Sequence, residues 1–153
     1  WDGAKKLSGR KRHLLVDTGG LVLRAVVHAA NLSDRQGARQ VLDAVPECFP
    51  TVQHIWVDAG YTGEVVTWAQ QRLGLTLTVV KRPSRRVWLP ADQEPPPLPP
   101  GMPILPRRWV VERTFAWLGR WRRLSKDYEQ LPATEVAWIQ VAMIQLMTRR
   151  LAA

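Results

Sequence analysis

Asp58 and Glu112 are the two side chains of this sequence whose surroundings best suit chemistry. Asp58 directly follows an apolar run at residues 54–57 and precedes a glycine-containing segment at residues 59–61. In open α/β sheets, ligand sites lie at the carboxyl ends of strands, where Asp58 is expected. Glu112 is the only acid between residues 107 and 126, a segment that also holds seven arginine and lysine residues. A carboxylate among phosphate-binding arginines indicates a site that acts on a polyanion.

Both acids also have structural explanations that involve no chemistry. An aspartate after a strand often forms a turn or a cap. Glu112 could pair with Arg108 on a solvated helix face, an interaction worth a few tenths of a kcal/mol. Tyr61 either lines the same site as Asp58 or is buried in the core. The residues alone leave these alternatives open.

The positive charge of the chain is concentrated in two segments. The 153 residues carry a formal net charge of +9, with a pI near 10.8. Residues 1–17 hold five basic and two acidic side chains, and residues 107–126 hold seven basic and one acidic. The rest of the chain is neutral, with ten basic and ten acidic side chains. Such local surpluses indicate a docking surface for nucleic acid rather than for a membrane. We expect DNA phosphate contacts from Lys5, Lys6, Arg10, Lys11, Arg12, Arg108, Arg113, Arg120, Arg123 and Lys126.

Composition excludes several other classes of protein. Apolar residues make up 46% and charged residues 23%, which is typical of a globular chain, and 153 residues fit one domain. The single cysteine, Cys48, allows no intramolecular disulfide and argues against a cysteine-based zinc site. No apolar run is long enough for a transmembrane helix, and the basic, polar first residues do not resemble a signal peptide.

Hydrophobic patterning predicts an α/β fold, a mixed sheet with flanking helices. Residues 12–17 and 21–30 are expected to form a hairpin around a glycine-containing turn. Asn31 or Ser33 is expected to cap a helix at residues 34–44. Strands at 54–58 and 75–80 are joined by a helix at 64–73 with Thr62 as its N-cap. A strand–helix–strand unit with such short connections is typical of parallel pairing.

A proline-rich segment precedes two further predicted helices. Residues 83–106 hold nine of the 12 prolines, which favours an extended loop over an SH3-type ligand. Helical periodicity covers 107–126, apart from Gly119, and 134–150, where Glu135 suits the helix dipole. Trp109 is expected either at a rim against the proline-rich loop or stacked on an unpaired base. Glu112 lies opposite the packed half of the first helix, which comprises Val110, Val111, Thr114, Phe115, Trp117, Leu118, Trp121 and Leu124.

Three stretches together resemble the DDE transposases of bacterial insertion sequences, of the insertion-sequence-five type within the insertion-sequence-four/five superfamily. They read GRKRHLLVDT at residues 9–18, VDAGY at 57–61 and RRWVVERTFAWL at 107–118. The resemblance implies a ribonuclease-H-like fold in which three acids hold two Mg²⁺ or Mn²⁺ ions, with Asp58 as the second acid and Glu112 as the third. Two such ions activate a water or a DNA 3′-hydroxyl and stabilise the leaving oxygen during strand cleavage and strand transfer.

The same resemblance implies partners and a location. The partner would be double-stranded DNA, both the transposon ends and the target. A homo-oligomer is expected in the synaptic complex. The location would be the bacterial cytoplasm, in association with the nucleoid.

The first acid of the family pattern has no counterpart in this sequence. In the family its strand lies well before the GRKRH stretch, and this sequence begins at Trp1, so residues 1–153 are predicted to be a partial catalytic domain that lacks its central first strand. Asp2 matches a linker position and Asp17 the end of the following strand. We therefore expect weak activity from the chain alone. A DNA-binding remnant without activity and another ribonuclease-H-like nuclease are the alternatives.

One local departure concerns phosphate binding. The related insertion-sequence-four signature is Tyr-x2-Arg-x3-Glu-x6-Lys, and its Tyr and Lys positions are Leu105 and Gly119 here. Arg120 or Arg123 is expected to take over the phosphate contact of the missing lysine.

Overall fold

The computed structural model describes Lys6, residues 8–80 and residues 108–152, apart from the side chain of Arg108. The proline-rich segment, Lys5 and Arg107 lie outside the described residues. No helix of the described part is long and apolar enough to cross a membrane.

The predicted hairpin is confirmed. Strand β1 (Arg10–Val16) pairs antiparallel with β2 (Val22–Ala29). The turn closes through hydrogen bonds between Asp17 and Leu21: the Leu21 amide donates to Asp17 Oδ1 at 2.8 Å and the Asp17 amide to the Leu21 carbonyl at 2.9 Å. Gly20 adopts a φ of 83° in this turn, a conformation that glycine enters without steric cost.

The predicted strand–helix–strand unit is confirmed as well. Strands β3 (His54–Asp58) and β4 (Thr76–Val80) pair in parallel and are joined by the 3-10 turn η1 (Ala59–Tyr61) and helix α3 (Glu64–Leu73). Thr62 was a wrong prediction for the N-cap, because Gly63 takes that position with a φ of 76° and no side-chain cap bond.

Two short helices connect the hairpin to β3. Helix α1 (Asp34–Leu42) begins at a capping box in which Ser33 accepts from the Gln36 amide, so Ser33 is the cap. Helix α2 (Val45–Cys48) follows at once.

Helix α4 (Arg108–Gly119) ends earlier than expected. The chain continues as a 3-10 turn, η2 (Arg122–Leu124), and then as helix α5 (Pro132–Leu151). Val110, Thr114, Leu118 and Leu124 of the predicted packed half are buried, whereas Phe115 is 38% exposed.

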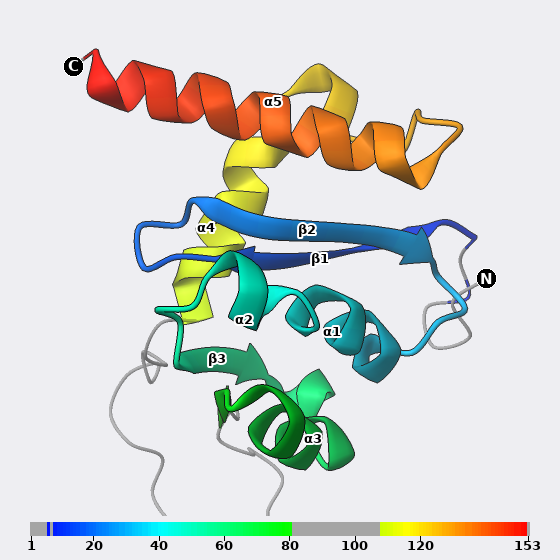
Figure 1. Ribbon diagram of the computed structural model, residues 1–153. Helices are drawn as coiled ribbons and strands as arrows, with labels where there is room; N and C mark the ends of the chain where they lie inside the picture. Colours follow the sequence, from blue (N-terminus) through cyan, green and yellow to red (C-terminus); the bar gives the residue numbers. More distant parts are fainter. Residues whose placement is uncertain (1–5, 7, 81–107, 153) are drawn as a thin grey trace, which may run out of the picture.

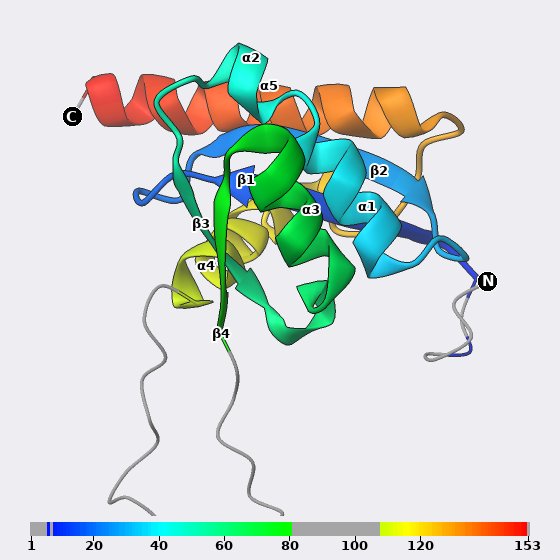
Figure 2. The same cartoon turned by 60° about the horizontal axis from the view of Figure 1, so that its bottom comes forward.

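A mixed sheet without its first strand was expected, and the described residues form two separate two-stranded sheets, β1–β2 and β3–β4. Helix α5 lies on one side of the hairpin, and α1 packs on the other, between the hairpin and α3 (Figures 1 and 2). The core consists of two apolar clusters. The first joins β1, α1 and α2 to β3, α3 and β4 and contains Leu15, Ala38, Val41, Leu42, Val45, Ile55, Val65, Ala69, Leu75 and Leu77. The second joins β2 to α4, η2 and α5 and contains Val27, Leu118, Leu124, Ile139, Ala142 and Met143.

Candidate active site

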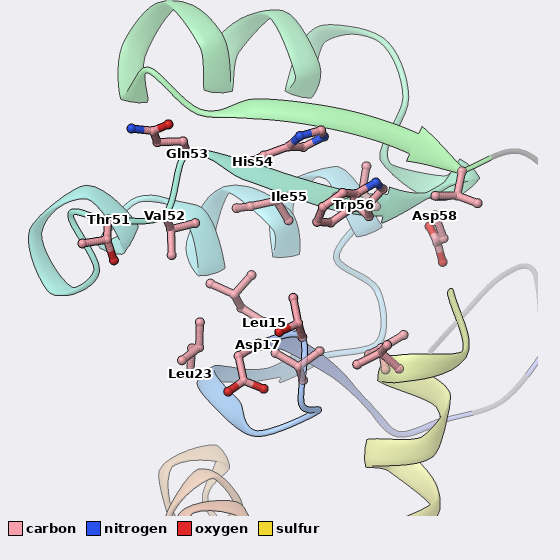
Figure 3. Close-up of a pocket in the computed structure, with 16 residues that line it drawn as sticks. Leu15, Asp17, Leu23, Thr51, Val52, Gln53, His54, Ile55, Trp56 and Asp58 are labelled. Carbon is pink, nitrogen blue, oxygen red and sulfur yellow. The ribbon is translucent and has the colours of Figure 1, made fainter. Parts of the chain in front are cut away.

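A slot separates the two sheets. Its volume is about 490 Å³, and it is lined by β1, by the whole of β3 and by the start of α4 (Figure 3). Among the residues that the structure describes, β1 pairs only with β2 and β3 only with β4, so each strand turns an edge without a described strand partner toward the slot. The two strands run in opposite directions (Figure 1). The slot has Asp58 toward one end and, further along it, Asp17 (Figure 3).

Asp58 ends β3, as predicted, and also caps the turn that follows. Its Oδ1 accepts a hydrogen bond from the Gly60 amide at 2.8 Å. The side chain is exposed, so it can meet a ligand while the cap fixes its orientation. The turn-cap explanation and the chemical one are therefore compatible.

Glu112 lies on the helix that starts beside Asp58. Val110 and Val111 line the same slot as Asp58 and Val80, so the first turn of α4 meets the carboxyl ends of β3 and β4. Glu112 is exposed and takes part in an interaction within the protein.

Helix α4 is fixed to the hairpin turn by two hydrogen bonds. Thr114 Oγ1 donates to the Gly20 carbonyl at 2.6 Å, and Arg113 Nη2 donates to the Gly19 carbonyl at 2.8 Å. Thr114 is fully buried. These bonds set the position of α4, and with it Glu112, relative to β1.

Two of the arginines predicted to bind DNA are engaged with the segment that leads into α5. Arg10 donates to the carbonyls of Glu129 at 2.8 Å and Gln130 at 2.6 Å. Arg12 donates to the Leu124 carbonyl at 2.8 Å and forms an ion pair with Glu135. These guanidinium groups hold the fold together, which leaves them few donors for phosphate.

Three more predicted DNA contacts are also occupied. Lys11 pairs with Asp34 at 3.1 Å. Arg113 stacks between two tryptophans, with its guanidinium 4.3 Å from the ring centre of Trp109 and 4.7 Å from that of Trp117. Arg123 donates to Glu129 Oε1 at 2.7 Å.

Three of the predicted DNA contacts remain open. Lys6, Arg120 and Lys126 are exposed and form no ion pair within the described part of the chain. Trp109 is 51% exposed and stacks on Arg113, a contact that neither of the two predictions for it included.

The sequence did not predict that Glu135 is buried and paired with two arginines. Its side chain is only 2% exposed and lies 3.9 Å from Arg10 in addition to its pair with Arg12. The helix-dipole role predicted for it explains neither its burial nor its partners. Nothing in the local sequence signals the pairing, because the partners lie more than a hundred residues away.

His13, His28 and Tyr61 form a second unpredicted group, next to Asp58. The two imidazole rings stack with centroids 4.7 Å apart, and His13 Nδ1 lies 2.7 Å from Tyr61 Oη. Burial is the main cause that lowers the pKa of His13, and burial with the nearby Asp58 and Asp34 raises that of Tyr61. Tyr61 is partly buried against the first apolar cluster and does not line the slot, and it stays neutral near pH 7.

Comparison with known proteins identifies the family. The family model described as "Transposase DDE domain" matches residues 1–147. A protein of Burkholderia cepacia, described as "Putative transposase for insertion sequence element IS402", is 29% identical over 129 residues. That match covers 80% of this chain and 54% of the relative, so the chain spans about half the length of that relative. No solved structure matches. Nearly the whole chain is covered by the family model, and the chain therefore belongs to the transposase DDE domain family.

Proposed function

We propose that this chain is part of the catalytic domain of an insertion-sequence transposase of the insertion-sequence-five type, one that cleaves DNA strands and joins the freed ends to target DNA. Asp58 and Glu112 are its second and third catalytic acids. The observation that carries this proposal is that Asp58 and the first turn of α4 line one slot, in a chain of the DDE family.

Divalent ions suit what these two residues offer. Both are exposed carboxylates, the oxygen donors that Mg²⁺ and Mn²⁺ favour. In the described residues, no three acidic, histidine or cysteine side chains form a group that could hold a metal ion, and the family pattern adds a third acid to Asp58 and Glu112 as a further ligand. When bound, a pair of ions supplies a nucleophile and stabilises the leaving oxygen. The chain's own contribution is to fix its acids: the Gly60 amide orients Asp58, and Thr114 anchors the helix of Glu112.

The further ligand would come from a strand that fills the slot. The slot is bordered by two strand edges that have no partner among the described strands, and such edges bind an added strand through backbone hydrogen bonds. Since β1 and β3 run in opposite directions (Figure 1), an added strand would be antiparallel to one and parallel to the other. It would join the two sheets into the single mixed sheet expected of a ribonuclease-H-like fold. An aspartate on it near Asp58 would be the first acid.

DNA would be held partly at a distance from the acids. Arg120 and Lys126 follow the C-terminal end of α4, a helix of 12 residues, about 18 Å long at 1.5 Å per residue. We propose Lys6, Arg120 and Lys126 as the phosphate contacts, with Lys5 and Arg108 as further candidates. Nucleoid association and a homo-oligomeric synaptic complex belong to the same proposal.

The test is a cleavage and strand-transfer assay with labelled end DNA of the element and Mg²⁺. The chain is assayed as it stands and with its reading frame extended upstream of Trp1. We expect weak or no product from the chain alone and joined product from an extension that adds an Asp-containing strand. Asp58→Asn or Glu112→Gln should abolish the joined product, whereas Asp43→Asn, an exposed carboxylate at the end of α1, should not.

Three outcomes would contradict parts of this proposal. Robust activity of the chain alone that is lost on Asp17→Ala would make Asp17 the first acid. Hydrolysis without joining would favour another ribonuclease-H-like nuclease. DNA binding without any chemistry in the extended chain would favour a remnant.

A further inference from the structure

A buried histidine pair supports the turn that follows Asp58. Unlike Asp58, the two histidines do not line the slot. His13 on β1 and His28 on β2 are each 6% exposed, and their rings stack. Both Nε2 atoms face the backbone of α1 at Gly37, where an alanine Cβ would lie 2.4 and 2.5 Å from them. Because neither Nε2 atom has a hydrogen-bond partner among the described residues, the protons of the two rings can be assigned.

The Nδ1 atoms carry the protons in both rings. His28 Nδ1 lies 2.8 Å from the Ala29 carbonyl, which only accepts, so this nitrogen is the donor. For His13, a proton on Nε2 would be a buried N–H without an acceptor, which is rare in folded proteins. His13 Nδ1–H therefore donates to Tyr61 Oη at 2.7 Å.

Tyr61 connects this bond to Asp58. Tyr61 is the last residue of the 3-10 turn η1, and Asp58 is the residue that caps the same turn through the Gly60 amide. The Tyr61 ring also meets the His13 ring edge-on, at 6.0 Å between centroids. A continuous path of contacts thus runs from the hairpin through His13 and Tyr61 to the cap of Asp58.

We propose that His13 is a positioning residue for Asp58, and that protonation of His13 loosens the turn at residues 59–61. The catalytic consequence rests on the proposed function, but the coupling between His13 and the turn does not. It can be measured without DNA or metal, so its failure is distinguishable from a failure of the proposed function.

The surroundings of His13 determine the direction of the effect. Burial, followed by His28 on β2 and then Lys11 on β1, lowers its pKa from the ordinary 6.5, and Asp34 on α1 and Asp58 on β3 oppose this without reversing it. Tyr61 faces it as a neutral hydrogen-bond partner. His13 is therefore neutral at pH 7 and takes up a proton only in more acidic solution. The added proton would sit on Nε2, against the α1 backbone and beside His28. Since the Nδ1–H bond to Tyr61 persists on protonation, the loosening would come from displacement of the His13 ring away from α1, which moves Tyr61 and the turn with it.

The test follows solvent exchange of the Gly60 amide by NMR between pH 5 and 8, corrected for intrinsic exchange. The His13 ring resonances give the midpoint of its titration. In the unaltered chain, protection of the Gly60 amide should fall by about five- to tenfold through that midpoint, equivalent to about one hydrogen bond. Tyr61→Phe should remove this step. Tyr128→Phe is the matched control, because Tyr128 is the other tyrosine and is 56% exposed.

Two results would overturn the proposal. The first is a protection of the Gly60 amide that does not change at the pH of the His13 midpoint, or that changes there to the same extent in Tyr61→Phe. The other needs no variant: the ring ¹⁵N shifts of the unaltered chain report the tautomer. A proton on His13 Nε2 at pH 7.5 would contradict the assigned hydrogen bond.

Discussion

Replacement of Gly37 by alanine sets two known effects against each other. Gly37 is buried inside α1, and alanine in a helix interior is favoured over glycine by about 1 kcal/mol. Against this gain, the new Cβ would lie 2.4 Å from His13 Nε2, 2.5 Å from His28 Nε2 and 2.7 Å from His13 Cδ2. The stacked rings cannot both withdraw, because each is buried and His13 is bonded to Tyr61.

Overpacking of a tight core typically costs about 1–3 kcal/mol. Three contacts below 3 Å place Gly37→Ala at the upper end of that range, so we expect a net loss of about 2 kcal/mol in the free energy of unfolding. For a chain of this length, this corresponds to a decrease of about 4–8 °C in Tm.

Urea unfolding followed by circular dichroism measures this loss. Gly119→Ala is the matched control, because a Cβ there meets nothing within 4 Å, and it should be neutral or slightly stabilising. A Gly37→Ala chain as stable as Gly119→Ala would refute the close packing of the two histidines against α1.

Further predictions concern charge, hydrogen bonding and pH. Glu135→Ala should lower the free energy of unfolding by about 2–3 kcal/mol. This is less than the about 3–5 kcal/mol lost when a fully buried ion pair is broken, because Arg12 is 21% exposed. Glu47→Ala, an exposed control on α2, should leave the free energy of unfolding unchanged. Thr114→Val leaves the Gly20 carbonyl without its 2.6 Å donor and should cost about 1–3 kcal/mol. Because the pKa of His13 is lowered in the folded chain, a falling pH protonates this histidine in the unfolded chain before the folded one. The free energy of unfolding measured in urea should therefore fall as the pH drops below 6.5, and it should fall less in His13→Gln. DNA affinity should fall about 40-fold between 50 and 200 mM salt if Lys6, Arg120 and Lys126 make three phosphate contacts. Six to ten phosphate contacts would instead lower the affinity by about 10³–10⁵-fold over the same range.

Local features of the fold were predictable from the sequence. The strand at 54–58 and the helix at 64–73 were predicted with their observed bounds, because an apolar run and an amphipathic run are separated by Gly60 and Gly63. The hairpin followed from its glycine turn. Ser33 as a cap is a property of a few neighbouring residues.

Long-range pairings were not predictable in the same way. Whether Arg10 and Arg12 meet phosphate or Glu135 depends on residues about 120 positions away. The pairing of the described strands in two sheets could not be read from the periodicity of the individual strands, which does not show how they pair. Charge counting therefore located the basic segments, whereas the structure shows which cations are already paired.

Asp58 and Glu112 combine predictable local features with a long-range arrangement that only the structure shows. Their motifs and the elements beneath them were predicted from the sequence, and the structure brings the end of β3 and the start of α4 to one slot. Their roles as metal ligands stay a prediction.

Titration of Mn²⁺ into the ¹⁵N-labelled chain shows whether Asp58 and Glu112 bind one cluster of divalent ions. Bound Mn²⁺ broadens the amide resonances of nearby residues. We expect the amides of residues 58–60 and 111–113 to broaden first and together, and Asp58→Asn to remove the effect at both segments. Broadening that begins elsewhere, such as around Asp43, or that affects only one of the two segments, would contradict this expectation.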